Sequence, residues 1–511
     1  MLSYENSINT NMKTNEDINK TIKKDEYEKV IFWVGSGVSY EKPTCFPLGN
    51  SLTKLALEDG LDKDCESFID NYKKVAKILD LPLKECPRLE TIFQIYKDID
   101  ENYNTNYLSK LKIFGEAEPN INHYLLANAI NNGCFVFTSN FDNCIEKAYK
   151  NLFNKELTED NIHHFHGTFD NIGSIGISID NIYKIDSETE KVLIEILNKR
   201  YLHIFIGYSL SDDLDINNYL SNNKSESDAI FINHTNQDEI KELEASKRKL
   251  LENCFKNVEE KSINTTKLLD DNFGPINKNI IHKNAYNFVD NYKKHIARKR
   301  INNNFFKVYL SEYIGTIPDK IFPFFPFLSK YTRKYTKHIF FKTKISTINL
   351  IECVNEFKEK ETIKSYDINR LSWGIYINYC EGLYVENNNT EHLDWLLEEI
   401  DKKLNYNELL FGEKNTLLRN KGVLITIRGL DDGEKFINEA KERYRNISNI
   451  DGVVGCMVDL YLCNLIRNKI NKNDISKDET DKLEELLEMN VLLPKHKQHY
   501  EYFKKKLASC K

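Results

Sequence analysis

The 511-residue chain lacks paired cysteines and long apolar runs. Its 11 cysteines stand singly, with no C-x-x-C pair, which is typical of reduced thiols in a cytosol and offers no paired metal ligands. No stretch approaches the ~18 consecutive apolar residues that a membrane span needs. Residues 1–26 form a polar extension without the apolar core of a signal peptide. We therefore expect a cytoplasmic protein that does not engage a membrane.

An excess of positive charge is also absent. The 71 Lys and Arg residues face 78 Asp and Glu residues, for a net charge of −7, so no overall field favours nucleic acid. The basic residues between 330 and 344 are spaced as on a solvated helix or strand face, and we favour that interpretation over a local nucleic-acid site. A chain of this length exceeds the ~250–300 residues at which single cores stop growing, so at least two domains are expected.

The first half of the chain alternates short apolar runs with longer amphipathic stretches. Such a rhythm is typical of parallel strands joined by crossover helices, and uninterrupted apolar runs indicate a sheet covered on both faces. We therefore predict a Rossmann-like parallel α/β domain over residues 27–292. The runs expected to form its strands are 30–34, 134–137, 204–206 and 229–232.

The character changes near residue 290, where a basic stretch runs into three asparagines. Beyond it, apolar stripes at helical spacing predict an all-α domain over residues 300–511. Serial helix pairs favour a tetratricopeptide-like array, but no period can be fixed, so an irregular helical bundle is a nearly equal alternative. The aromatic segment 322–328 either buries its rings at the junction of the two domains, which we favour, or forms a partner-binding patch.

Two polar segments follow the first two predicted strands. Gly35-Ser36-Gly37-Val38-Ser39 could bring backbone N–H groups to a phosphate, although it lacks the third glycine of the dinucleotide fingerprint. Thr138-Ser139-Asn140-Phe141-Asp142 offers an amide and a carboxylate that could hold an amide or a sugar. Taken alone, this segment favours helix capping by Asn140 and Asp142 over ligand binding.

Three further polar segments follow along the chain, two of them at the ends of predicted strands. His163-His164-Phe165-His166-Gly167 has the spacing of metal ligands, but no acidic or cysteine cluster is near in sequence, and a neutral His166 could instead act as a general base. Gly207 and Ser209 follow the third predicted strand, and Asn233 follows the fourth. Since open parallel sheets bind ligands at the carboxyl edge, five such segments in series predict a ligand site there.

In this order, G-S-G-V-S, T-S-N-F-D, H-G, G-Y-S-L-S-D and I-N resemble the sirtuin family over roughly residues 25–290, and more closely its sirtuin-like branch in bacterial anti-phage defence proteins. The resemblance implies a sheet that binds NAD and cleaves its nicotinamide–ribose bond. It implies that Asn140 positions water, Asp142 holds the carboxamide and His166 is the base. The implied contacts to the phosphates and riboses are Gly35, Ser36, Gly37, Ser39, Gly207, Ser209 and Asn233.

Two departures from the deacylating sirtuins bear on the reaction. The chain has no C-x-x-C zinc module, and the loop after Pro47 lacks the F-R pair of the deacylases. We therefore expect an NAD glycohydrolase without a metal, acting as an effector that depletes NAD in abortive infection. The alternatives are an ADP-ribosyl transferase or cyclase and a non-catalytic NAD- or ADP-ribose-binding module. The helical domain is expected to form a homo-oligomer or to sense a phage-derived or partner-protein trigger.

Overall fold

The computed structural model describes residues 27–298 and parts of the chain beyond. Outside the described residues lie 84, 104–106, 159, 170–184, 186, 211–215, 236–242 and 283, and, after 298, residues 299–305, 307–309, 311–392, 406–410, 431, 472–476, 490–495, 498–499, 502–503 and 506–511. The N-terminal extension, the aromatic segment 322–328 and the basic residues between 330 and 344 therefore lie outside the described residues. None of the described helices is long and apolar enough to cross a membrane.

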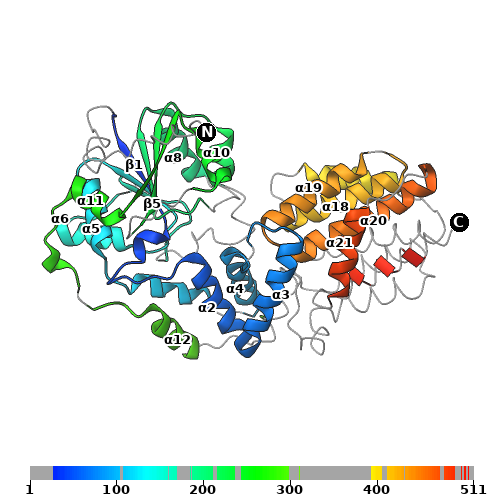
Figure 1. The fold of residues 1–511 in the computed structure, drawn as a ribbon, viewed down its shortest axis with the longest axis horizontal. Helices are drawn as coiled ribbons and strands as arrows, with labels where there is room; N and C mark the ends of the chain where they lie inside the picture. The colour runs from blue at the N-terminus through cyan, green and yellow to red at the C-terminus, as the bar shows by residue number, and fades with distance from the viewer. Residues whose placement is uncertain are drawn as a thin grey trace, which may run out of the picture. The chain divides into compact units, whose positions relative to one another are not determined.

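The described chain divides into two compact units (Figure 1). The sheet unit contains the described residues of 27–49, 108–177 and 181–297, and the helical unit contains those of 50–107 and of 298–511. The segment 50–107 thus groups with the C-terminal helices, although it lies inside the stretch that we expected to form one domain. The boundary expected near residue 300 stays a prediction.

The sheet unit is built on six parallel strands in the order β3-β2-β1-β4-β5-β6. This arrangement confirms the predicted Rossmann-like α/β fold. The order reverses between β1 and β4, and ligands of open parallel sheets bind at such a switch point. The strands are β1 (Val30–Val34), β2 (Phe135–Thr138), β3 (Ile162–His164), β4 (Leu202–Ile206), β5 (Asp228–His234) and β6 (Asn257–Ile263).

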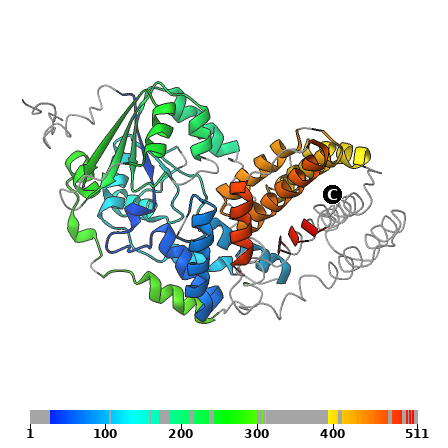
Figure 2. The same cartoon turned by 45° about the vertical axis from the view of Figure 1, so that its right-hand side comes forward.

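Helices cover both faces of the sheet (Figures 1 and 2). Successive β1 residues alternate between two cores, Phe32 facing α5, α6 and α11 and Trp33 facing α8, α9 and α10. Full burial of β1 on both faces explains its uninterrupted apolar sequence. The helices are α5 (Ile121–Asn131), α6 (Cys144–Phe153), α8 (Ser187–Asn198), α9 (Ile216–Asn222), α10 (Ala245–Cys254), α11 (Thr265–Phe273) and α12 (Phe288–Arg298), with 3-10 turns η2 (Ser36–Ser39), η4 (Leu108–Gly115) and η6 (Lys278–Ile280).

The four predicted apolar runs form β1, β2, β4 and β5, whereas β3 and β6 were not predicted. The strand β3 has three residues, two of them histidines, so no apolar run marks it. Among the described strands, β6 pairs with β5 alone, and most of its side chains are partly exposed. Its polar sequence reflects a position at the edge of the sheet, where burial on both faces is not required.

The helical unit confirms the prediction of a helical C-terminal region. Consecutive helices α18, α19 and α20 pack on one another. Segment 50–107 joins them through two arginines: Arg88 Nε donates to the Asn446 carbonyl at 2.9 Å, and Arg445 Nη2 lies 3.0 Å from Asp80 Oδ2. The helices of the helical unit are α2 (Gly49–Leu61), α3 (Cys65–Ile78), α4 (Leu89–Tyr103), α17 (Leu393–Leu404), α18 (Phe411–Ile427), α19 (Gly433–Asn446), α20 (Ile450–Asn471) and α21 (Lys477–Glu488), with the 3-10 turn η3 (Asp62–Asp64).

Candidate active site

The loops that follow β1 and β4 meet backbone to backbone at the switch point of the sheet. The Gly35 N–H donates to the Ile206 carbonyl at 3.1 Å, and the Gly37 N–H donates to the Gly207 carbonyl at 3.0 Å. A Cβ added to Gly207 would lie 2.6 Å from the backbone nitrogen of Val38, and Gly207 has a φ of +57°. Close packing of the two loops therefore requires these glycines, whether or not they also contact a phosphate.

The Ser39 hydroxyl is the centre of a buried polar cluster beside these loops. Its Oγ donates to Asp142 Oδ2 at 2.9 Å and lies 3.1 Å from both His123 Nε2 and Asn140 Nδ2. Ser39 is only 1% exposed. Three chain segments that are far apart in sequence are joined here: the loop after β1, the first turn of α5, and the loop between β2 and α6.

The first turn of α5 fixes the tautomer of His123. Asn120 caps the helix, and its backbone N–H donates to His123 Nδ1 at 3.0 Å. Because Nδ1 accepts this bond, the ring proton lies on Nε2 and is donated to Ser39 Oγ. Burial lowers the pKa of His123 to about 4, although Asp142 and Glu146 oppose the shift, so the ring is neutral near pH 7.

The Ser39 hydroxyl in turn fixes the amide of Asn140. Its single proton is donated to the Asp142 carboxylate, so it can only accept from Asn140, and Nδ2 must face it. The Asn140 N–H donates to Thr138 Oγ1 at 3.1 Å, and the Asn140 carbonyl lies 2.7 Å from His164 Nδ1. Within the described part of the chain, Asn140 Oδ1 accepts no hydrogen bond. The Asn140 side-chain amide is thus held at the carboxyl edge of the sheet through its Nδ2, and its Oδ1 is left to accept a hydrogen bond from a ligand or water.

Asp142 joins the loop after β1 to the start of α6. Its Oδ2 accepts from Ser39, and its Oδ1 accepts from the Cys144 N–H at 3.1 Å. The second bond is a local side-chain-to-backbone contact of the Asx-turn type. It is not a helix cap, because the N-cap residue of α6 is Asn143, which makes no side-chain capping bond. A carboxylate has about four acceptor positions, so these two bonds leave capacity for a further donor.

His166 is buried in an aromatic setting directly after β3. Its ring lies against Phe165, with centroids 4.5 Å apart, and against Phe141 at 6.3 Å. The following Gly167 has a φ of +74° and donates its N–H to the His164 carbonyl at 3.0 Å. Since Phe141 follows Asn140 directly, the turn after β3 and the loop after β2 are packed together around this imidazole.

The remaining predicted contacts lie at the ends of three strands. Ser36 after β1 and Ser209 after β4 are exposed. Asn233, near the end of β5, donates from Nδ2 to a carboxylate oxygen of Glu260 on β6. Because β6 was not predicted, this partner of Asn233 was missed. The roles of Ser36, Ser209 and Asn233 as ligand contacts stay predictions.

Three potential metal ligands, His123, Asp142 and Cys144, lie within 4.8 Å of one another. They do not fit a metal centre, because His123 Nδ1 accepts from the Asn120 N–H and Nε2 carries the ring proton, so neither nitrogen offers a lone pair to a metal. Burial, together with the Asp142 carboxylate, raises the pKa of the Cys144 thiol well above its usual value, which disfavours the thiolate that binds metals. A structural zinc site also needs four ligands.

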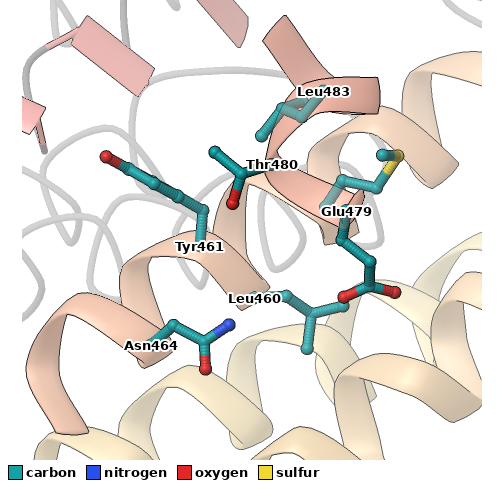
Figure 3. A pocket seen from close by; sticks show the side chains of 7 residues that line it. Leu460, Tyr461, Asn464, Glu479, Thr480 and Leu483 are labelled. Carbon is teal, nitrogen blue, oxygen red and sulfur yellow. The ribbon is translucent and has the colours of Figure 1, made fainter. Parts of the chain in front are cut away.

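The helical unit contains a pocket between α20 and α21 (Figure 3). Its only acidic lining side chain, Glu479, lies 3.5 Å from Lys441 Nζ. A nucleophile with an adjacent base is not found among the side chains that line it, so this pocket is a weaker candidate for catalysis. The lining residues are Met457, Leu460, Tyr461, Asn464, Glu479, Thr480 and Leu483.

The fold and the buried cluster define a Rossmann-like α/β domain with polar groups gathered at the ligand-binding edge of its sheet. Residues 135–255 match the family model of the SIR2-like domain. The matched segment runs from β2 to the end of α10 and includes Asn140, Asp142 and His166, whereas the loop after β1 precedes it. A search of curated proteins finds no match to the chain. The SIR2-like match indicates an NAD-related function.

Proposed function

We propose that the sheet unit hydrolyses NAD to nicotinamide and ADP-ribose. The observation that carries this proposal is the fixed amide of Asn140, which is bound through its backbone and its Nδ2 while its Oδ1 accepts no hydrogen bond from the described residues. An acceptor held at the carboxyl edge suits the orientation of a water molecule. The SIR2-like match over this segment supports NAD as the substrate.

The proposed reaction breaks the bond between the nicotinamide nitrogen and C1′ of the ribose. Both bonding electrons leave with nicotinamide, and positive charge develops on the sugar. Water adds to C1′ and loses one proton, so NAD+ and water give nicotinamide, ADP-ribose and H+. Asn140 Oδ1 accepts a hydrogen bond from the attacking water, and neutral His166 takes its proton. A base of this kind contributes about 10²–10⁴-fold.

The other side chains hold the substrate. The Asp142 carboxylate has acceptor capacity beyond its two bonds and receives the carboxamide NH2 of nicotinamide. Ser39, whose proton and two lone pairs are used, positions Asn140 and Asp142, and any further contact to the ribose stays a prediction. The phosphates and the adenosine ribose are assigned to Gly35, Ser36, Gly37, Gly207, Ser209 and Asn233.

The biological output is NAD depletion during abortive infection by phage. Unrestrained NAD hydrolysis would harm the host, so the activity requires control. We assign that control to the helical unit, through homo-oligomer formation or through a phage-derived or partner-protein trigger. This assignment depends on the proposed activity.

Product analysis tests the reaction. Purified full-length protein is incubated with NAD, with and without lysate of infected cells, and the products are separated by mass. Nicotinamide and linear ADP-ribose in equal amounts are expected. A cyclic product would show that the reaction is cyclisation instead of hydrolysis. An ADP-ribosylated acceptor would show that it is transfer. Tight binding of NAD that stays intact in every state would make the unit a regulatory binding module.

A further inference from the structure

His164, the last residue of β3, lies between two hydrogen-bond acceptors. Its Nδ1 is 2.7 Å from the main-chain carbonyl of Asn140, and its Nε2 is 2.7 Å from Glu146 Oε1. Glu146 stands in the first turn of α6. The side chains of His164 and Glu146 are 10% and 25% exposed, so water screens this contact little.

Counting protons shows what these contacts require. A carbonyl oxygen only accepts, and an ionised carboxylate only accepts, so both ring nitrogens of His164 must donate. Either the ring is an imidazolium beside a carboxylate, or a neutral ring faces a protonated Glu146. Both forms hold one proton more than a neutral imidazole with an ionised carboxylate. Loss of that proton necessarily breaks one of the two hydrogen bonds.

The surroundings favour retention of this proton. Burial alone lowers the pKa of His164, but the bond and charge of Glu146, the Asn140 carbonyl and the Asp142 carboxylate outweigh it and raise the pKa. The neighbouring strand β2 has no titratable residue. Lys147 on α6 donates instead to the carbonyls of Gly115 and Ala117.

We infer that His164, held by Glu146, is a positioning residue that fixes the main chain of Asn140 only while the His164–Glu146 pair keeps its shared proton. The inference deepens the proposed NAD hydrolysis and depends on it for the activity measurement. A base and a positioning acid have opposite pH dependences. Loss of the proton from the His164–Glu146 pair produces the alkaline limb of the pH profile.

The direction of the pH effect follows from the raised pKa. The contribution of the His164–Glu146 pair to stability is present below the pKa of an unfolded histidine and is lost as the pH rises through the higher folded pKa. The order of the Asn140 main chain, and with it kcat, therefore falls on the alkaline side. The KM for NAD changes less, because His164 is not assigned a substrate contact.

Glu146→Gln tests the inference, because glutamine keeps the shape of the side chain and removes its charge. We expect the alkaline limb of kcat to move toward neutral pH by about one unit. In His164→Gln the alkaline limb due to this pair disappears and kcat is lower. The matched control is His163→Gln, on the same strand. His163 Nε2 lies 2.8 Å from Thr189 Oγ1 and not beside Glu146, so this variant should leave the alkaline limb in place.

Histidine NMR separates this inference from the proposed function. The full-length protein has 12 histidines, and the signal missing in His164→Gln identifies the one of interest. We expect that signal to titrate above the ordinary range in the native protein, and lower in Glu146→Gln, together with a shift of the Asn140 amide signal. This result without any nicotinamide release would overturn the proposed function and keep the positioning role. An ordinary pKa for His164, or an alkaline limb unmoved in Glu146→Gln, would overturn the inference.

Discussion

The two units use buried polar groups differently. In the helical unit, Arg419 of α18 pairs with Asp459 of α20 through two bonds, with Nη2 3.1 Å from Oδ1. Burial lowers the pKa of Arg419, but Asp459 outweighs it and the net shift is upward. In the sheet unit, the Ser39 hydroxyl is hydrogen-bonded to side chains from distant segments, and Asn140 Oδ1 accepts no hydrogen bond from the described residues. The helical pair is a closed structural contact, whereas the sheet cluster is suited to a ligand.

Replacing the helical ion pair tests whether it is only structural. Arg419→Met leaves Asp459 buried without its partner and should lower the free energy of unfolding of the helical unit by about 3–5 kcal/mol. Arg419→Met combined with Asp459→Leu should recover most of the loss, because an apolar pair can replace a buried ion pair. Chemical denaturation measures both. A double variant as unstable as the single one would contradict this view of the pair.

Ser39→Ala probes the sheet cluster. It removes the shared partner of His123, Asn140 and Asp142, and we expect a loss of about 2–3 kcal/mol in the free energy of unfolding, since buried polar groups lose their bonds. Nicotinamide release should fall as well, because the Asn140 amide is no longer held.

The matched control is Ser36→Ala in the same loop. Ser36 is exposed, so its loss should change stability by no more than about 0.5 kcal/mol. Equal stabilities of the two alanine variants would show that the Ser39 hydroxyl does not organise the cluster.

The contact between the loops after β1 and β4 gives a smaller effect. Gly207→Ala combines a positive φ with a clash against the Val38 nitrogen, and should destabilise the sheet unit by about 2 kcal/mol. Gly133→Ala is the control, because Gly133 has a φ of +87° but nothing within 4 Å of an added Cβ, and should cost about 1 kcal/mol. Thermal unfolding compares them, and a larger loss at Gly133 would contradict the packing argument.

What the sequence predicted depends on how local each signal is. Fully buried strands such as β1 are apolar throughout and were found, whereas the edge strand β6 has a mixed sequence and was not. Asn140 was predicted because it directly follows a buried strand. His123, which shares the Ser39 hydroxyl with Asn140, lies in a helix from another part of the chain. Only the Asn120-x-x-His123 spacing, which resembles a capping box, could have marked it.

The contact between His164 and Glu146 could not be predicted for the same reason. It joins the end of β3 to the first turn of α6 across the sheet edge, and no spacing along the chain signals it. His164 and His166 have the His-x-His spacing of metal ligands, but the structure directs His164 to Glu146 and packs His166 against Phe141 and Phe165. Tertiary packing decides these partners.

The most direct test is single-turnover release of nicotinamide by native protein and by Asn140→Ala, with NAD affinity measured in parallel. Asn222→Ala, on the exposed surface of α9, is the matched control. We expect release by the native protein and the control, and a loss of at least about 10²-fold in Asn140→Ala while NAD still binds. Equal release by Asn140→Ala, or no release by the native protein with or without infected-cell lysate, would contradict the account.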